Sequence, residues 1–213
     1  MGKMPALAAG HGRGARSTRF DWRRARSVFH GILWLAWAGY WLASARSRGA
    51  SRCSESWQSG VSYWAPLAAG TFLMAAPQVI PPPGPDRRAT GEPLPPHPPA
   101  ALAMQVAGLG LTVWARRHLG RYWSAVIALK DGHRVVQSGP YGVIRHPIYA
   151  GLILALLGTA ICLGSAQRFL ALGFLLFSFL RKLVLEEAWL CEHLGAEYRG
   201  YRSRVKALVP FVW

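Results

Sequence analysis

The sequence predicts an all-α fold, that of a polytopic helical membrane protein with about five transmembrane helices, a C-terminal helical hairpin and a cytosolic extension. Hydrophobic residues make up 52% of the 213 residues, yet 25 Lys and Arg residues against 9 Asp and Glu residues give a net charge of +16. These charges gather in blocks between long uncharged apolar runs. A soluble basic protein spreads its charges along the chain, so this pattern favours a protein with several membrane spans.

The basic excess also limits the expected partners. It suits the anionic headgroups of membrane lipids, whereas no motif for nucleic-acid recognition accompanies it, so no nucleic acid is expected. Cys53, Cys162 and Cys191 are odd in number and lack metal-type spacing, so neither a disulfide framework nor a metal is expected. The first apolar run follows a long polar arm, so no cleavable signal peptide is expected either.

The N-terminal half divides into three predicted parts. Residues 1–26 form a Gly-, Ala- and Arg-rich basic arm, expected to be disordered because it has few apolar anchors. Residues 27–80 contain two apolar membrane spans, 27–45 and 61–80, whose Trp and Tyr residues are interpreted as interfacial anchors rather than a substrate box. Residues 81–99 form a proline-rich linker, since dense Pro fits neither helix nor central strand, and a spacer is favoured over a binding epitope.

Residues 100–213 are predicted to form the functional core. The segment 100–114 is a short third span, whose Gly108 and Gly110 suit close helix packing in lipid. The orientation stays open, because three spans would place two basic segments, the N-terminal arm and residues 119–145, on opposite faces of the membrane. The positive-inside rule cannot satisfy both.

A helical hairpin follows in the sequence. Residues 148–164 form a fourth span, and a fifth helix begins at Phe169 after a tight turn. Its apolar pattern continues past Arg181 and Lys182, which mark the expected membrane edge, as far as Gly195, a helix C-cap. One arm of the hairpin is therefore expected to protrude from the membrane.

Two motifs point to a site. Residues 138–151 are rich in Gly and Pro, and contain Arg145-His146-Pro147 just where the fourth span begins, a place where polar groups are costly unless they are used. Glu186-Glu187 lies on the protruding helix, where adjacent side chains point about 100° apart, so the two carboxylates cannot face one ligand atom. A solvated surface pair is the alternative interpretation of these glutamates.

A third motif lies after Gly195. If this segment is helical, Tyr198, Tyr201 and Arg204 form one stripe at three-residue spacing. Such a stripe fits an interfacial helix. It also fits a site in which the guanidinium of Arg204 holds an anionic group of the substrate.

Taken together and in this order, these motifs resemble the isoprenylcysteine carboxyl methyltransferase family of integral membrane methyltransferases, and more distantly the phospholipid N-methyltransferases. The resemblance covers about residues 117–213, and whether it includes the third span stays open. Residues 1–99 have no such resemblance. Arg-His-Pro-x-Tyr followed at hairpin distance by Glu-Glu is specific, although neither half is specific alone. The residues on which the resemblance rests are Trp123-Ser124, His133, Ser138–Tyr141, Arg145–Gly151, Glu186-Glu187, Gly195, Glu197-Tyr198, Tyr201, Arg204-Val205 and Pro210.

The resemblance implies a site for S-adenosylmethionine at the membrane surface. This cofactor presents an ammonium, a carboxylate and ribose hydroxyls, which require carboxylates and hydrogen-bond donors from the protein. The implied cofactor-binding residues are His133, Tyr141, Arg145, His146, Tyr149, Glu186 and Glu187. Arg204 and Tyr201 are implied to bind the substrate, and Arg204 and His146 to act in catalysis.

The implied activity is methyl transfer to a lipophilic or amphiphilic acceptor. Carboxyl O-methylation is the reaction that the resemblance favours most. Phospholipid or small-amine N-methylation, for which His146 or a Glu would be the base, and a non-enzymatic membrane scaffold are the alternatives. The Arg- and Ala-rich composition suggests a high-GC bacterial source. The expected location is therefore the bacterial inner membrane with the cofactor site facing the cytoplasm. A small lipophilic acid, thiol, amine or lipid headgroup is then favoured over a prenylated protein as acceptor.

Overall fold

The computed structural model describes residues 22–44, 51–80, 99–130, 132 and 134–210. Most of the predicted basic arm, nearly all of the proline-rich linker and the candidate residue His133 lie outside the described residues.

The described residues form six α-helices and one pair of short strands, so the predicted all-α class is confirmed. Strands β1 (Ser51–Ser54) and β2 (Ala128–Lys130) pair antiparallel, a contact between the two halves of the chain that the sequence did not predict. The helices are α1 (Trp22–Ser44), α2 (Trp57–Ala75), α4 (Pro99–Leu119), α5 (Pro147–Leu163), α6 (Ala166–His193) and α7 (Gly195–Arg204).

The prediction of about five membrane spans finds no support in these helices. Within the described residues, no helix combines the length with the hydropathy that a bilayer crossing requires. The second predicted span also ends early: α2 stops at Ala75, not at Ile80. The reason is Pro77, which disfavours helical backbone at Ala76.

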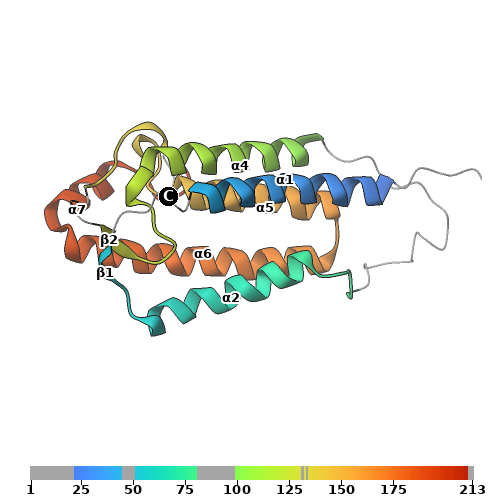
Figure 1. Cartoon of the computed structure of the whole chain (residues 1–213), viewed down its shortest axis with the longest axis horizontal. Helices are drawn as coiled ribbons and strands as arrows, with labels where there is room; N and C mark the ends of the chain where they lie inside the picture. The colour runs from blue at the N-terminus through green and yellow to red at the C-terminus, as the bar shows by residue number, and fades with distance from the viewer. Residues whose placement is uncertain (1–21, 45–50, 81–98, 131, 133, 211–213) are drawn as a thin grey trace, which may run out of the picture.

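The helices form two packed pairs, with α4 against α5 and α2 against α6 (Figure 1). Glycine allows the first pair to approach closely: a Cβ at Gly108 would lie 2.4 Å from the carbonyl oxygen of Gly151. The predicted role of Gly108 is therefore confirmed. Gly110 has no atom within 4 Å of its Cβ position, so its predicted role in close packing is wrong.

The N-terminal helices are joined to the rest by polar contacts. On α1, the indole nitrogens of Trp34 and Trp37 donate to Thr159 (3.2 Å) and Thr112 (2.7 Å), and His30 contacts Gln105. On α2, the carbonyl of Tyr63 accepts from Ser178 Oγ at 2.7 Å. Both helices therefore pack directly on the segment of residues 100–213.

In the hairpin formed by α5 and α6, α6 is the longer arm and extends beyond α5, as the sequence predicted. It ends before Gly195, whose φ of 55° is the left-handed conformation of a helix C-cap. After α7 the chain returns beside the loop that precedes α5, where Arg145 N donates to Lys206 O (2.7 Å) and His146 N to Ala207 O (3.0 Å). This loop, α7 and the strand pair thus gather at one end of the bundle (Figure 1).

Candidate active site

Glu187 joins the loop before α5 to α6 and α7. Its Oε1 accepts a hydrogen bond from Arg145 Nε at 2.6 Å, forms an ion pair with Arg145 Nη2 at 2.6 Å, and lies 3.1 Å from His146 Nε2. Its Oε2 pairs with Arg202 Nε at 3.1 Å. Because the residue is only 5% exposed and both oxygens have protein partners, Glu187 acts as a clamp between three segments.

Two opposing effects act on the pKa of Glu187. Burial raises it, whereas the hydrogen bonds and positive charge of His146 and Arg145 lower it, and the lowering prevails. The carboxylate is therefore ionised at neutral pH, as the clamp on Arg145 requires.

Glu186 has a different environment, as the 100° between adjacent helical residues predicts. Its Oε2 accepts from the hydroxyl of Tyr149 at 2.6 Å. The Tyr149 ring stacks on His146, with 5.4 Å between ring centroids, and on Phe179, at 5.9 Å. Glu186 lines the cavity described next, and no other described residue forms a hydrogen bond with its carboxylate.

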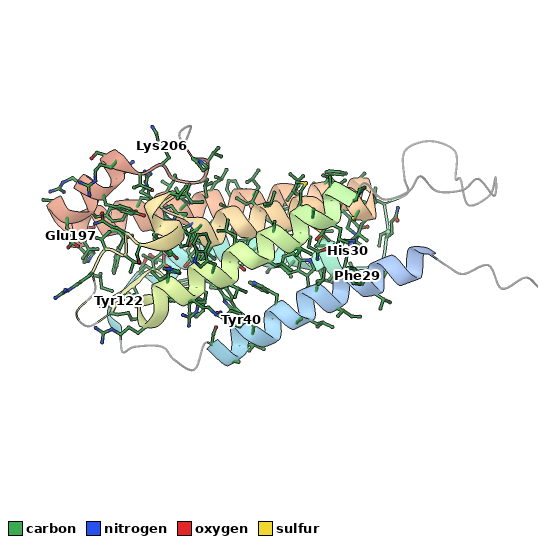
Figure 2. All side chains as sticks on the ribbon, turned by 90° about the horizontal axis from the view of Figure 1, so that it is seen from above. Phe29, His30, Tyr40, Tyr122, Glu197 and Lys206 are labelled. Carbon is green, nitrogen blue, oxygen red and sulfur yellow. The ribbon has the colours of Figure 1, made fainter. Side chains whose placement is uncertain are left out.

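A cavity of about 260 Å³ lies between the two halves of the chain. The C-terminal half contributes polar and aromatic side chains to its wall: Tyr141, Arg145, His146, Tyr149, Lys182, Glu186, Tyr198 and Tyr201. The N-terminal half contributes an apolar and aromatic wall: Trp37, Trp41, Tyr63, Trp64 and Leu67. Tyr122, another lining residue, lies with Glu197 and Lys206 at one end of the bundle, whereas Phe29 and His30 lie toward the other (Figure 2).

Three buried tyrosines, Tyr141, Tyr198 and Tyr201, form part of the cavity wall. Tyr201 is 2% exposed, and its hydroxyl donates to the carbonyl oxygen of Tyr141 at 2.7 Å. Burial is the main cause that raises the pKa of Tyr141, Tyr198 and Tyr201 above the ordinary value. The three hydroxyls therefore stay neutral at physiological pH, and that of Tyr201 serves as a hydrogen-bond donor.

The structure brings most of the predicted site residues together. Those that line the cavity are Tyr141, Arg145, His146, Tyr149, Glu186 and Tyr201. Glu187 is not among the lining residues and contacts Arg145 and His146. Arg204 does not line the cavity: it is exposed, and its Nη2 donates to Gln137 Oε1 at 3.1 Å.

Sequence reasoning missed the contribution of the N-terminal aromatic residues. Trp37, Trp41, Tyr63 and Trp64 were expected to be interfacial anchors, but they line the cavity. Their spacing alone carried no signal, because a helix face turned to lipid and one turned to a cavity can have the same pattern.

Lys182 was missed as well, since it was assigned to the membrane edge. It lines the cavity, four residues before Glu186 on the same helix face. The residue one helical turn before Glu186 on the same face is Lys182, so the helical period would have identified it. In the part of the chain that the structure describes, no three His, Cys, Asp or Glu side chains form a group able to hold a metal ion.

Comparison with known proteins gives a consistent result for the C-terminal half. Residues 101–192 match the model of the isoprenylcysteine carboxyl methyltransferase (ICMT) family. A protein-S-isoprenylcysteine O-methyltransferase of Schizosaccharomyces pombe is 31% identical over 116 residues, which are 53% of this chain and 49% of that protein. Protein-S-isoprenylcysteine O-methyltransferase B of Arabidopsis thaliana is 30% identical over 114 residues, 52% and 58% of the two chains.

The human protein-S-isoprenylcysteine O-methyltransferase is 32% identical over 83 residues, which are 38% of this chain and 29% of that protein. The chain thus spans about half the length of the curated relatives it matches, and the first 99 residues lie outside the matched family segment.

Proposed function

Because residues 101–192 match the model of the isoprenylcysteine carboxyl methyltransferase family, we propose that this chain is an S-adenosylmethionine-dependent methyltransferase acting at a membrane. Its proposed acceptor is the carboxylate of a lipophilic molecule. The observation that carries this proposal is a cavity in which the polar groups of the family segment face an aromatic wall. Such a cavity can hold a polar donor and an apolar acceptor side by side.

The lining residues fit the donor by chemical type. Glu186 has one carboxylate oxygen that no described residue engages, which suits the donor's ammonium or ribose hydroxyls. Tyr149 and His146 hold this carboxylate and the adjacent wall in place. When bound, S-adenosylmethionine would supply a methyl group on a positively charged sulfur, which would leave as a neutral thioether when the acceptor's oxygen bonds to the methyl carbon.

The protein's part in this reaction is positioning. A carboxylate acceptor is already anionic, so it needs no general base, and the residues of the cavity align the two reactants and exclude water. Glu187 orients His146 through Nε2 and Arg145 through Nε and Nη2. His146 and Arg145 are therefore positioning residues in the wall of the cavity.

The proposed location rests on the outer surface of the bundle. Large apolar side chains are exposed along α1 and α6, and exposed apolar patches of this kind mark interaction with membranes or other proteins. The most exposed on these helices include Val28, Ile32, Leu35, Leu42, Phe177 and Val184. Residence in the bacterial inner membrane, with the site facing the cytoplasm, stays a prediction, and the relatives named above are eukaryotic.

A methyl-transfer assay tests the activity. Purified protein in lipid nanodiscs is given S-adenosylmethionine labelled in the methyl group, with N-acetyl-S-farnesylcysteine, a long-chain amine or phosphatidylethanolamine as the acceptor. The proposed function predicts base-labile label, a methyl ester, with the acid alone. Base-stable label on either amine would instead support N-methylation, and absence of label from all three would contradict the proposal.

A further inference from the structure

Lys182 is a cation in an aromatic part of the cavity wall. Its Nζ donates to the carbonyl oxygen of Ala125 at 2.5 Å. The same nitrogen lies 5.1 Å from the ring centroid of Tyr63, 5.7 Å from that of Trp64 and 6.0 Å from that of Tyr149. These contacts fix its position, but an ammonium has three donors, and the carbonyl accepts from only one.

No carboxylate among the described residues forms an ion pair with Lys182. The carboxylates of Glu186 and Glu55 are near enough to interact with its charge, but neither lies within ion-pair distance. Glu186 accepts from Tyr149 instead, and Glu55 accepts from Tyr63. Withdrawing an ammonium from water is costly unless a negative charge compensates for it. The environment of Lys182 therefore favours an anionic group of a ligand.

The guanidinium of Arg145, which also lines the cavity, is already engaged by protein groups. Arg145 donates through Nε to Glu187 and forms an ion pair with it through Nη2. Its Nη1 donates to the carbonyl oxygens of Arg202 and Val205. Arg204 is exposed and outside the lining. Of these three cations, Lys182 is the one that both lines the cavity and retains donors for a ligand.

The aromatic wall beside Lys182 is held rigidly. The hydroxyl of Tyr63 donates to Oε1 of Glu55, which also accepts from Ile127 N at 3.1 Å. Tyr63 is 1% exposed. The rings of Trp37 and Trp41 stack with 4.8 Å between centroids. This wall comes from residues 1–99, which lie outside the matched family segment.

We infer that Lys182 and this aromatic wall form the acceptor subsite, in which Nζ pairs with the acceptor's carboxylate and the wall receives its apolar tail. The inference rests on the proposed function and narrows it to anionic acceptors. Because Glu186 lies one helical turn from Lys182 on the same face, the acceptor's carboxylate would be held beside the group that suits the donor. Esterification removes the negative charge, so the product loses its ion pair with Lys182.

Equilibrium binding without the cofactor tests this subsite. The probes are N-acetyl-S-farnesylcysteine and its methyl ester, titrated into the full-length protein in nanodiscs and followed by tryptophan fluorescence. The wild type is expected to bind the acid roughly tenfold or more tightly than the ester, as a charged hydrogen bond implies. Lys182→Met should bring this ratio close to one, and Lys182→Arg should retain most of it.

Arg181→Met is the matched control, because it removes the same charge from the exposed neighbouring residue. It should keep the acid-over-ester preference of the wild type. A preference that survives in Lys182→Met, or one that is absent from the wild type, would overturn the inference. So would loss of S-adenosylmethionine binding in Lys182→Met with the preference intact, which would assign Lys182 to the cofactor.

These outcomes are separable from failure of the proposed function. A wild type that prefers the acid but transfers no methyl group contradicts the activity and supports the anion subsite. A wild type that forms the ester but has no preference contradicts the subsite and supports the activity.

Discussion

Glu187 is a buried carboxylate whose four protein contacts join three segments of the chain. Removing its charge leaves Arg145 without its counterion in a largely buried place. Glu187→Gln is therefore expected to lower the free energy of unfolding by about 3 kcal/mol, the lower end of the cost of breaking a buried ion pair. Chemical denaturation measures this difference. Glu192→Gln, an exposed carboxylate on the same helix, should change it by less than about 0.5 kcal/mol.

The same carboxylate predicts a pH dependence. Its pKa lies below the ordinary value of 4.5 in the folded protein, so its contribution to stability is full above that value and is lost as the pH falls through the lowered pKa. The wild type should therefore lose its advantage over Glu187→Gln as the pH falls below 4.5 and through the lowered pKa. Melting temperatures between pH 3 and pH 8 measure it, and an advantage independent of pH would contradict the assignment.

Lys182 shows why a residue's role could not be taken from its type alone. Lysine at the end of an apolar run is typical of a membrane edge, and this was the interpretation from sequence. Its contacts with Ala125 and the rings of Tyr63 and Trp64 join segments more than fifty residues apart, which no local pattern records. The motif residues Arg145, His146 and Glu186 were predictable, because each belongs to a short, specific motif.

At the scale of elements, the α5–α6 hairpin was predictable and the strand pair was not. Pro147 at the first turn of α5 and the left-handed Gly195 after α6 are local signals for helix ends. The strands β1 and β2 have four and three residues, too few for a periodic pattern, and their partners are distant in sequence.

The close packing of α4 on α5 gives a prediction at this scale. Gly108→Ala places a Cβ 2.4 Å from the Gly151 carbonyl oxygen and 2.6 Å from Ala155 N, both backbone atoms that cannot move aside alone. It should lower stability by about 1–3 kcal/mol, the usual cost of overpacking. Gly110→Ala on the same helix meets no atom within 4 Å and should be neutral or slightly stabilising. Equal melting temperatures of the two variants would contradict this packing.

At the scale of the molecule, the site lies between the two halves of the chain. The family resemblance seen in the sequence covers about residues 117–213, so it gave residues 1–99 no part in the site. The structure places Trp37, Trp41 and Tyr63 in the cavity wall, because α1 packs on α4 and α5 and α2 packs on α6. This long-range packing depends on contacts such as Ser178 with the carbonyl of Tyr63, which the sequence does not reveal.

The exposed apolar side chains give a prediction for the whole molecule. Leu35 and Leu42 on α1 are each 73% exposed, which is costly in water but favourable against acyl chains. The protein is expected to stay in the membrane pellet after an alkaline carbonate wash. Its release into the supernatant in folded form would contradict the proposed location.

The most direct test of the central proposal is S-adenosylmethionine binding, measured by calorimetry on the purified full-length protein. The wild type should bind saturably at one site, and Glu186→Gln should weaken the affinity roughly tenfold or more through loss of a charged hydrogen bond. Glu192→Gln, which is exposed on the same helix, should bind as the wild type does. Absence of saturable binding to folded wild-type protein, or equal affinity in wild type and Glu186→Gln, would contradict a donor site at Glu186.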